Sequence, residues 1–261
     1  MTPAAVFDAG AEAYDAQFSR TLIGGMMRRA VWARCAARFG AGSNILEMNC
    51  GTGEDALWLA RHGLNVLATD TAPEMLRIAR AKIAAAAGKV RFHNVRFRQL
   101  AWEQLAALEE GPFDGMLSNF GGLNCVEDLR AAACALAGRL RPGAAAILCI
   151  MGPCVPWEWL WFLSQGRPDR AFRRLRRQGA TWAGLRIRYP SIRQTRQAFA
   201  PEFRVVRSSA LGALLPPPYT GKILARAPRL ISGLNRLERS IETLWPLPAL
   251  ADHYVLELLR R

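Results

Sequence analysis

The feature that most constrains this chain is a regular alternation of strand-like and helix-like segments through its middle. Short apolar runs alternate with Ala- and Leu-rich stretches, and breaks such as Gly111-Pro112 and Pro142-Gly143 separate several of them. We expect strands at residues 44–48, 64–69, 90–99, 113–118 and 145–151, and helices at 55–61, 74–87 and 129–140. Strands separated by helices predict an α/β doubly wound sheet, mostly parallel, with helices on both faces.

Past residue 152 the pattern changes. We expect a long helix over 156–178, whose spacing puts Arg170, Arg173, Arg174 and Arg177 on one face. Strands are expected at 185–188 and 203–211 around a helix at 191–199. After three consecutive prolines at 216–218, helices are expected at 221–227 and 229–244, and a final, antiparallel strand at 254–259. The chain is thus predicted to be a single domain over 1–261, with an N-terminal helical cap (1–40), a core (41–152) and helical lid insertions at 153–180 and 216–249.

The composition excludes several classes of protein. An apolar content of 51% in 261 residues indicates a packed globular core. No apolar run reaches the roughly 18–20 residues that cross a bilayer, so we expect a soluble, cytoplasmic protein, or one peripheral to a membrane. Six scattered cysteines form no close pair, so each is expected to be a small buried residue, and no metal site is predicted. They are Cys35, Cys50, Cys125, Cys134, Cys149 and Cys154.

The charge is concentrated in the second half of the chain. Residues 151–261 hold 19 Arg or Lys residues and 7 Asp or Glu residues, a net charge of +12, against +2 for residues 1–150. A basic face can attract phosphates, nucleic acid, anionic lipid or an acidic carrier protein, and charge alone does not choose among them. A solvated face without a partner is the alternative.

The strongest local signal is a glycine-containing turn after the first core strand. Gly51 and Gly53 allow a tight strand-to-helix turn, and their lack of side chains lets a ligand come close to the backbone there. Asp70, at the end of the next strand, is suited to accept hydrogen bonds from two ribose hydroxyls. A dinucleotide fingerprint would need glycines where the chain has Asn49 and Glu54, and Glu54 would repel a pyrophosphate. The turn therefore favours a nucleoside cofactor without phosphates.

In order and spacing, residues 45–75 resemble motifs I and II of the class I S-adenosylmethionine (SAM)-dependent methyltransferases, within the type 11 or ubiquinone/menaquinone-like group. Phe7-Asp8 and Tyr14-Asp15 resemble that group's N-terminal helix, residues 113–120 its fourth-strand motif, and residues 140–144 its turn before the fifth strand. Roughly residues 5–155 are covered. The resemblance implies a Rossmann-like methyltransferase sheet, SAM as cofactor and S-adenosylhomocysteine as product.

The resemblance also implies cofactor-binding positions. Glu47 and the turn would surround the methionine part of SAM, Asp70 would bind the ribose, Met75 would pack on the adenine and Tyr14 would close over the cofactor. The full set is Tyr14, Glu47, Asn49, Cys50, Gly51, Gly53, Asp70, Thr71, Met75, Ala101, Trp102, Asn119 and Phe120.

Two positions depart from the family pattern. Asn49 replaces the first glycine, although Asn is the non-glycine residue that best tolerates positive φ. Ala101 stands where an acid commonly accepts from the adenine amino group, and backbone at Ala101 and Trp102 is expected to substitute. Trp102 then lies either beside the adenine or in the core.

The acceptor is less constrained than the cofactor. The Asn-Pro-Pro-Tyr signature of nucleic-acid and protein amide methylation is absent at 118–121, so no DNA partner is expected. We expect a small hydrophobic or aromatic acceptor, such as a quinone, a polyketide-like phenol or a lipid precursor. Candidate substrate contacts are Asn124, Trp157, Trp161 and Tyr189; candidate catalytic residues are His253, Tyr189 and Glu158.

A second hypothesis is a basic protein that binds RNA or an anionic membrane surface through residues 167–177 and 186–207, with an auxiliary SAM fold. A lid that holds a methyltransferase near a membrane would reconcile the two hypotheses. The general base and the oligomeric state are not predicted.

Overall fold

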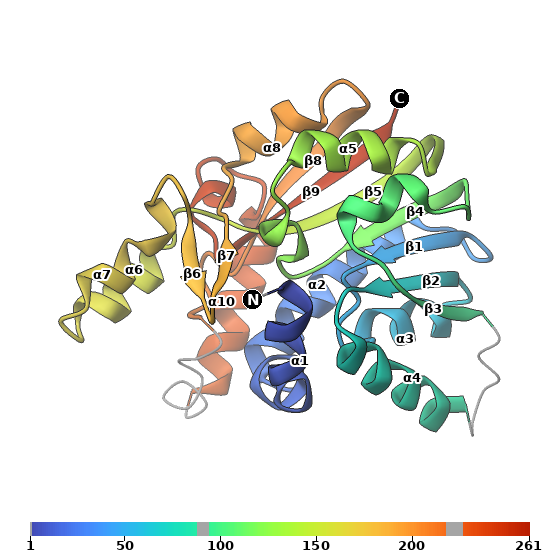
Figure 1. Ribbon diagram of the computed structural model, residues 1–261. Coiled ribbons are helices and arrows are strands. Elements are labelled where there is room, and N and C mark those ends of the chain that lie inside the picture. The colour runs from blue at the N-terminus through green and yellow to red at the C-terminus, as the bar shows by residue number, and fades with distance from the viewer. Residues whose placement is uncertain (1, 88–93, 218–226) are drawn as a thin grey trace.

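A seven-stranded sheet forms the centre of the computed structural model, which describes residues 2–87, 94–217 and 227–261 (Figure 1). Its order is β3-β2-β1-β4-β5-β9-β8. The strands are β1 (Asn44–Met48), β2 (Asn65–Asp70), β3 (Val95–Gln99), β4 (Phe113–Ser118), β5 (Leu140–Met151), β8 (Phe203–Leu211) and β9 (His253–Arg260).

The first five strands are parallel, and β9 is antiparallel to both of its neighbours. The α/β doubly wound fold and the antiparallel strand near the C-terminus are thereby confirmed. The central strands β1 and β4 are buried almost throughout, because helices cover both faces and leave little strand surface to water.

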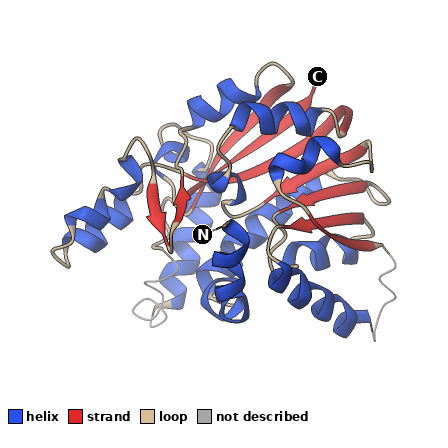
Figure 2. Ribbon diagram, in the orientation of Figure 1, coloured by secondary structure: helices blue, strands red, loops and turns tan. Residues whose placement is uncertain are grey.

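Helices lie on the two faces of the sheet (Figure 2). One face packs against α5 (Leu129–Ala137) and α8 (Ile192–Phe199). The other packs against α2 (Leu22–Arg38), α3 (Glu54–Arg61) and α10 (Pro228–Ile241). The helix expected at 129–140 ends at Ala137, since Leu140 already begins β5.

The N-terminal segment crosses the carboxyl edge of the sheet. Helix α1 (Pro3–Tyr14) continues as a short π-helix, η1 (Asp15–Ser19), and lies beside α4 (Pro73–Ala87) in Figure 1. The Asp8 carboxylate accepts a hydrogen bond of 2.8 Å from the backbone N–H of Glu74. The acid thereby caps the free N–H groups of the first turn of α4 and fixes α1 beside the residues that follow β2.

The segment between β5 and α8 differs from the prediction. A single helix over 156–178 is wrong: α6 (Pro156–Leu163) ends, and α7 (Pro168–Ala171) and a 3₁₀ turn, η4 (Arg173–Leu175), follow. Gly166 has a positive φ of 66° and Pro168 starts the next helix, so the backbone turns between them. A hairpin of β6 (Ala180–Trp182) and β7 (Leu185–Ile187) completes this segment, which we call the lid.

Helix α10, in the last part of the chain, packs against α2. Ile231 of α10 is buried in the cluster that contains Ile23 and Met26 of α2. Ile231 thus packs α10 against α2, and none of the described residues of 216–249 lines the cavity described below. The helix predicted at 221–227 lies almost wholly outside the described residues, whereas the one predicted at 229–244 is α10.

Candidate cofactor and acceptor site

A cavity of about 890 Å³ lies at the carboxyl edge of the sheet. Two groups of residues line it. One group comes from α1 and from the turns after β1 to β4, and it includes Tyr14, Met48, Asn49, Gly51, Asp70, Thr71, Met75, Leu100, Trp102, Glu103, Asn119 and Phe120. The other comes from the lid and the segment after it, and it includes Trp161, Phe162, Gln165, Arg170, Arg173, Trp182 and Tyr189. Of the predicted cofactor residues, Glu47, Cys50, Gly53 and Ala101 lie outside the lining.

The turn between β1 and α3 has the backbone that the sequence predicts. Asn49, Gly51 and Gly53 have φ values of 53°, 54° and 76°. A Cβ atom on Gly53 would lie 2.8 Å from the Cβ of Ala79, so this glycine also allows α4 to pack closely. Asn49 thus adopts the left-handed conformation of the glycine it replaces.

Asp70 connects this turn to the end of β2. Its carboxylate accepts hydrogen bonds from the backbone N–H of Gly51 at 2.8 Å and of Ala72 at 3.0 Å. Burial raises the pKa of Asp70 above its ordinary value, although these two N–H groups act in the opposite direction. The carboxylate is held in one orientation at the cavity wall, as ribose binding requires.

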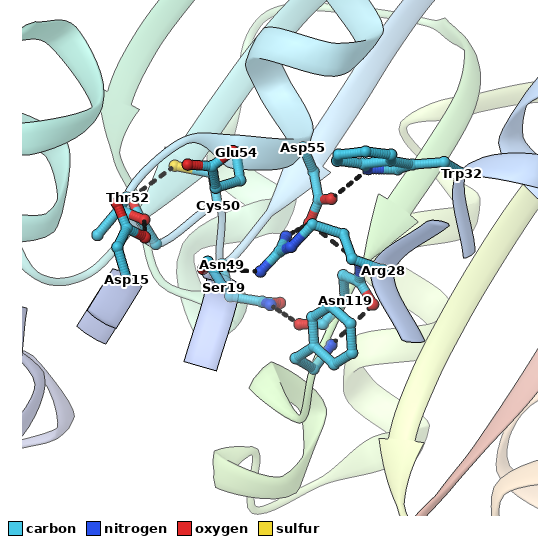
Figure 3. Close-up of polar contacts among 12 residues, drawn as sticks. Asp15, Ser19, Arg28, Trp32, Asn49, Cys50, Thr52, Glu54, Asp55 and Asn119 are labelled. Atoms are coloured by element: carbon cyan, nitrogen blue, oxygen red, sulfur yellow. Dashed lines mark hydrogen bonds and ion pairs between the residues drawn. The ribbon is translucent and has the colours of Figure 1, made fainter. Parts of the chain in front are cut away.

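Asn49 joins the turn to the end of β4 (Figure 3). Its Nδ2 donates to the backbone carbonyl of Asn119 at 2.7 Å, and its Oδ1 accepts from the Ser118 hydroxyl at 2.7 Å. The space beside Asn49 exists because residue 122 is glycine: a Cβ there would lie 2.0 Å from the Asn49 Cγ. Asn49, which stands in place of the family's glycine, therefore links the end of β1 to the end of β4.

A buried ion pair lies behind Asn119, and the sequence did not indicate it. Asp55 accepts from Arg28 at 2.5 Å, from the Trp32 indole at 2.6 Å and from the Asn119 amide at 3.0 Å (Figure 3). Burial opposes the charge of Arg28, but the adjacent Asp55 carboxylate raises its pKa above the ordinary value. The Arg28 guanidinium also lies 4.8 Å from the centre of the Phe120 ring. The pair fixes two cavity residues, Asn119 and Phe120, from the side of α2.

Lys82 of α4 ties the turn to the N-terminal segment. Its ammonium donates to Asp15 at 2.7 Å and to Glu54 at 2.6 Å, and Asp15 also accepts from the Thr52 hydroxyl at 2.6 Å. Burial disfavours the charged form of Asp15, but the hydrogen bonds from Lys82 and Thr52 outweigh it and lower the pKa. Glu54 pairs with Lys82 and does not line the cavity, so its predicted effect on a bound pyrophosphate is wrong.

The turn after β3 supplies the wall beside Asp70, whose carbonyl accepts from the Leu100 N–H at 3.0 Å. Leu100, Trp102 and Glu103 line the cavity there, next to Met75 of α4. The backbone N–H of Ala101 donates to the Gln104 side chain at 3.0 Å, so it is not free for a ligand as predicted. The indole Nε1 of Trp102 is buried without a partner among the described residues. Glu103, two positions past the missing acid, places a carboxylate at this wall, and the sequence analysis overlooked it.

Some aromatic residues of the lid line the cavity, and others pack within the lid or on α1. Trp161 lines the cavity, as does its neighbour Phe162, whereas Trp159 packs on Phe172 with ring centres 5.8 Å apart. Trp157 does not line the cavity, so one of the two predicted tryptophan contacts is present there. Trp182 packs on Phe7 of α1 at 5.9 Å. The lid and the N-terminal helix therefore close the cavity together.

The predicted basic face of 167–177 is partly internal. Arg174 is buried and donates to Glu158 at 2.9 Å and to Asp252 at 2.6 Å. Glu158 also accepts from Arg173 at 2.7 Å. These pairs anchor the lid to the ends of β5 and β9, and the Arg174 guanidinium stacks 5.1 Å from the Tyr189 ring centre. Local helical spacing misplaced these arginines because the helix is broken.

Of the candidate catalytic residues, only Tyr189 lines the cavity. Glu158 is buried in the lid ion pairs and is thereby engaged in structure. The Nδ1 atom of His253 lies 3.0 Å from the Asp252 carboxylate, and its ring packs edge-on against the Phe120 ring. His253 therefore supports the cavity residue Phe120 without lining the cavity itself. Asn124 bonds the backbone of Met151 and Arg188, which makes it a link between β5 and β7 and not a substrate contact.

Glu47 and Cys50 are buried at the turn and do not line the cavity. Burial, with a further contribution from Asp55, raises the pKa of Glu47 well above its usual range. Cys125 does line the cavity, and burial raises its pKa to about 11, so the thiol is protonated at neutral pH.

Cys134 is exposed, against the expectation for all six cysteines. Within residues 2–87, 94–217 and 227–261 no cluster of His, Cys, Asp or Glu is arranged to hold a metal ion.

The fold and the site can now be compared with known proteins. Residues 45–143 match the family model described as a methyltransferase domain. Over 147 residues the chain is 29% identical to a demethylmenaquinone methyltransferase of Tropheryma whipplei (strain Twist), covering 55% of this chain and 56% of that protein. The chain thus spans about half the length of the curated relatives it matches.

Two further comparisons give proteins of the same kind. A ubiquinone biosynthesis O-methyltransferase of Xylella fastidiosa (strain 9a5c) is 35% identical over 103 residues, which cover 40% of this chain and 39% of that protein. The crystal structure of an S-adenosylmethionine-dependent methyltransferase from Mesorhizobium loti superposes with a TM-score of 0.55 at 19% identity, over 89% of this chain and 98% of that one. The structural likeness supports the fold.

The residues present fit SAM. The cofactor carries no phosphate and has a cationic sulfonium, and the described core residues that line the cavity include the acids Asp70 and Glu103 but no Arg or Lys. Trp102 lines the wall suited to the adenine, and its Nε1 is buried without a partner among the described residues. The core lining, which has two acids and no cation among the described residues, replaces Glu54 as the argument against a pyrophosphate.

Proposed function

We propose that this chain transfers a methyl group from SAM to a small hydrophobic or aromatic acceptor. The observation that carries the proposal is one continuous cavity with two chemically different walls. The core wall offers carboxylates and backbone around Asp70, and the lid wall offers aromatic rings around Trp161. A cofactor and an acceptor would meet between them, at Asn119 and Phe120.

The core residues would hold the cofactor. Asp70 would accept from the ribose hydroxyls, Met75 and Trp102 would enclose the adenine, and the turn at 49–53 would surround the methionine part. Asn119 would stand beside the reacting methyl, held there by Asn49 and Asp55. SAM supplies a methyl group on a sulfonium, which is transferred by in-line displacement. The protein's contribution is to align the acceptor and exclude water.

The lid wall supports an acceptor that combines an aromatic ring with a polar or anionic oxygen. Phe162, Trp161 and Tyr189 provide stacking surface, and Arg170 and Arg173 add two guanidinium groups. Arg173 is paired with Glu158, whereas the Arg170 side chain makes no ion pair with any described residue. A quinol or a related phenol matches this combination, and the names of the curated relatives point to the same class.

No histidine lines the cavity within the described part of the chain. The Tyr189 hydroxyl is the candidate group for orienting the acceptor oxygen, with the Arg174 guanidinium stacked on its ring. An acceptor that already carries an anionic oxygen or an electron-rich carbon needs little help from a base. We therefore propose catalysis by positioning, with Tyr189 and Arg170 acting on the acceptor.

The test uses SAM with an isotopically labelled methyl group and a panel of acceptors: quinols, simple phenols, a carboxylated phenol and an aliphatic alcohol. Label is expected in the aromatic acceptors only. Arg170→Ala and Trp161→Ala are expected to raise the acceptor KM about tenfold or more while the SAM dissociation constant stays within about twofold, because they contact the acceptor alone.

Arg176→Ala is the matched control, since Arg176 is an exposed lid arginine that does not line the cavity. It is expected to leave both constants unchanged. Transfer to the aliphatic alcohol in preference to the aromatic acceptors would contradict the aromatic assignment. An equal effect of Arg170→Ala and Arg176→Ala would remove Arg170 from the acceptor site.

A further inference from the structure

The acids of helix α10 and of the turn after it face the protein interior, where Arg239 of the same helix also pairs with Glu242. Glu238 is fully buried and accepts from the backbone N–H groups of Gly212 at 2.8 Å and Leu214 at 2.7 Å. Glu242, just past the helix, is buried between Arg34 and Arg207, each at 2.8 Å. The acids of this segment thus face the protein, and each has cationic or N–H partners there.

The outward side of the same helix carries leucines and arginines. Leu230 and Leu237 are 58% and 51% exposed, and Leu244 and Trp245, in the turn after the helix, are 60% and 77% exposed. A spacing of seven residues puts Leu230 and Leu237 on one line of the helix. Arg229 and Arg236 precede them with the same spacing, are exposed, and have no ion-pair partner in the described part of the chain. The outward face therefore combines large apolar side chains with positive charge only.

The position of α10 relates this face to the cavity. Leu211 at the end of β8 pairs with His253, and His253 pairs with Met151, so β8 ends level with β5 at the carboxyl edge. Glu238 contacts residues just past this end, and the Glu242 carbonyl accepts from Ala210 inside the strand at 2.7 Å. The helix therefore runs opposite to β8, and its N-terminal turns project beyond the sheet edge that holds the cavity.

We propose that this face of α10, with Trp245, docks the protein on an anionic membrane surface. An interfacial helix has this composition: leucines that enter the acyl boundary, cations beside them at the phosphates, and a tryptophan at the interface. The absence of outward acids matches a negatively charged partner. In the described ranges no helix is long and apolar enough to cross a bilayer, so the contact is one at the surface. This proposal stands independently of the methyl acceptor.

The test is co-sedimentation of the full chain with vesicles of phosphatidylcholine alone or mixed with phosphatidylglycerol. Binding is expected to the mixed vesicles and to weaken with salt. Arg229→Gln with Arg236→Gln is expected to lower affinity for mixed vesicles about thirtyfold at low salt, given the usual effect of each cation near an anionic surface. Leu230→Gln with Leu237→Gln and Trp245→Gln is expected to lower it roughly tenfold or more.

Leu160→Gln with Leu163→Gln is the matched control, because these lid leucines are 65% and 46% exposed but lie on α6. The control is expected to bind vesicles like the wild type, and circular dichroism and thermal unfolding establish that all variants are folded. Loss of binding in the control with retention in the α10 variants would overturn the assignment. So would failure of the wild type to bind mixed vesicles, or a concentration-dependent dimer that the α10 variants abolish without any vesicle binding.

Discussion

Asn49 and Gly122 are predicted to be energetically coupled. A Cβ on Gly122 would lie 2.0 Å from the Asn49 Cγ and 2.1 Å from its Oδ1. Carbon atoms in contact are about 3.5–4.0 Å apart, so Gly122→Ala would displace the Asn49 side chain by more than about 1 Å. The displacement breaks its hydrogen bonds to Ser118 and Asn119, each 2.7 Å long.

The expected cost follows from these two effects. Overpacking costs about 1–3 kcal/mol and each lost hydrogen bond about 1 kcal/mol, so Gly122→Ala is expected to lower the free energy of unfolding by about 3 kcal/mol. In an Asn49→Gly background the space is open and both hydrogen bonds are already gone. There the same substitution is expected to cost less than about 0.5 kcal/mol, leaving a coupling of roughly 2.5 kcal/mol.

Urea unfolding of the wild type, both single variants and the double variant measures this coupling. Equal costs of Gly122→Ala in the two backgrounds would refute the reasoning. SAM affinity measured on the same four proteins is expected to fall most in Gly122→Ala alone, because the displaced Asn49 lies at the cofactor turn.

Three further predictions concern buried polar groups. Asp55→Asn is expected to lower the free energy of unfolding by about 3–5 kcal/mol in denaturant titrations, since it leaves Arg28 buried without its carboxylate, and a cost below about 1 kcal/mol would refute the role given to this pair. Trp102→Phe is expected to weaken SAM binding in calorimetry, because Trp102 lines the wall suited to the adenine; unchanged SAM affinity would assign Trp102 to core packing. Burial raises the pKa of Asp252, but Arg174 and His253 together lower it below the ordinary 3.8, so this carboxylate stabilises the fold fully above that pH and loses its contribution progressively as the pH falls from 3.8 toward the lowered pKa of the folded state. The stability gap between wild type and Asp252→Asn is therefore expected to narrow from pH 7 to pH 3 in urea titrations; a constant gap would contradict the pairing.

The sequence predicted the parallel core well because local rules govern it. Continuous apolar runs mark buried strands, and Gly51 and Gly53 mark the turn between β1 and α3. Asn49 was correctly expected to take a positive φ, since tolerance of that conformation is a property of the residue itself. Its hydrogen bonds to the end of β4 depend on a segment about 70 positions away, and no local pattern contains them.

The lid was predicted less well because side-chain direction there depends on tertiary partners. Helical spacing suggested one basic face, but Gly166 and Pro168 break the helix and Arg174 turns inward to Asp252. Glu103 lies two positions from the expected acid, and only the path of the turn after β3 brings it to the cavity. The buried pair of Arg28 and Asp55 joins two helices that neither composition nor spacing connects.

The central claim is that the cavity binds SAM through Asp70. Isothermal titration calorimetry of SAM against the wild type, Asp70→Ala and the control Asp114→Ala tests it directly, with thermal unfolding to verify that each variant is folded. Asp114 is an acid at the opposite edge of the sheet, where β4 begins. We expect binding by the wild type and the control, and a loss of about tenfold or more in Asp70→Ala. No binding by the wild type, or equal binding by folded Asp70→Ala, would contradict the account.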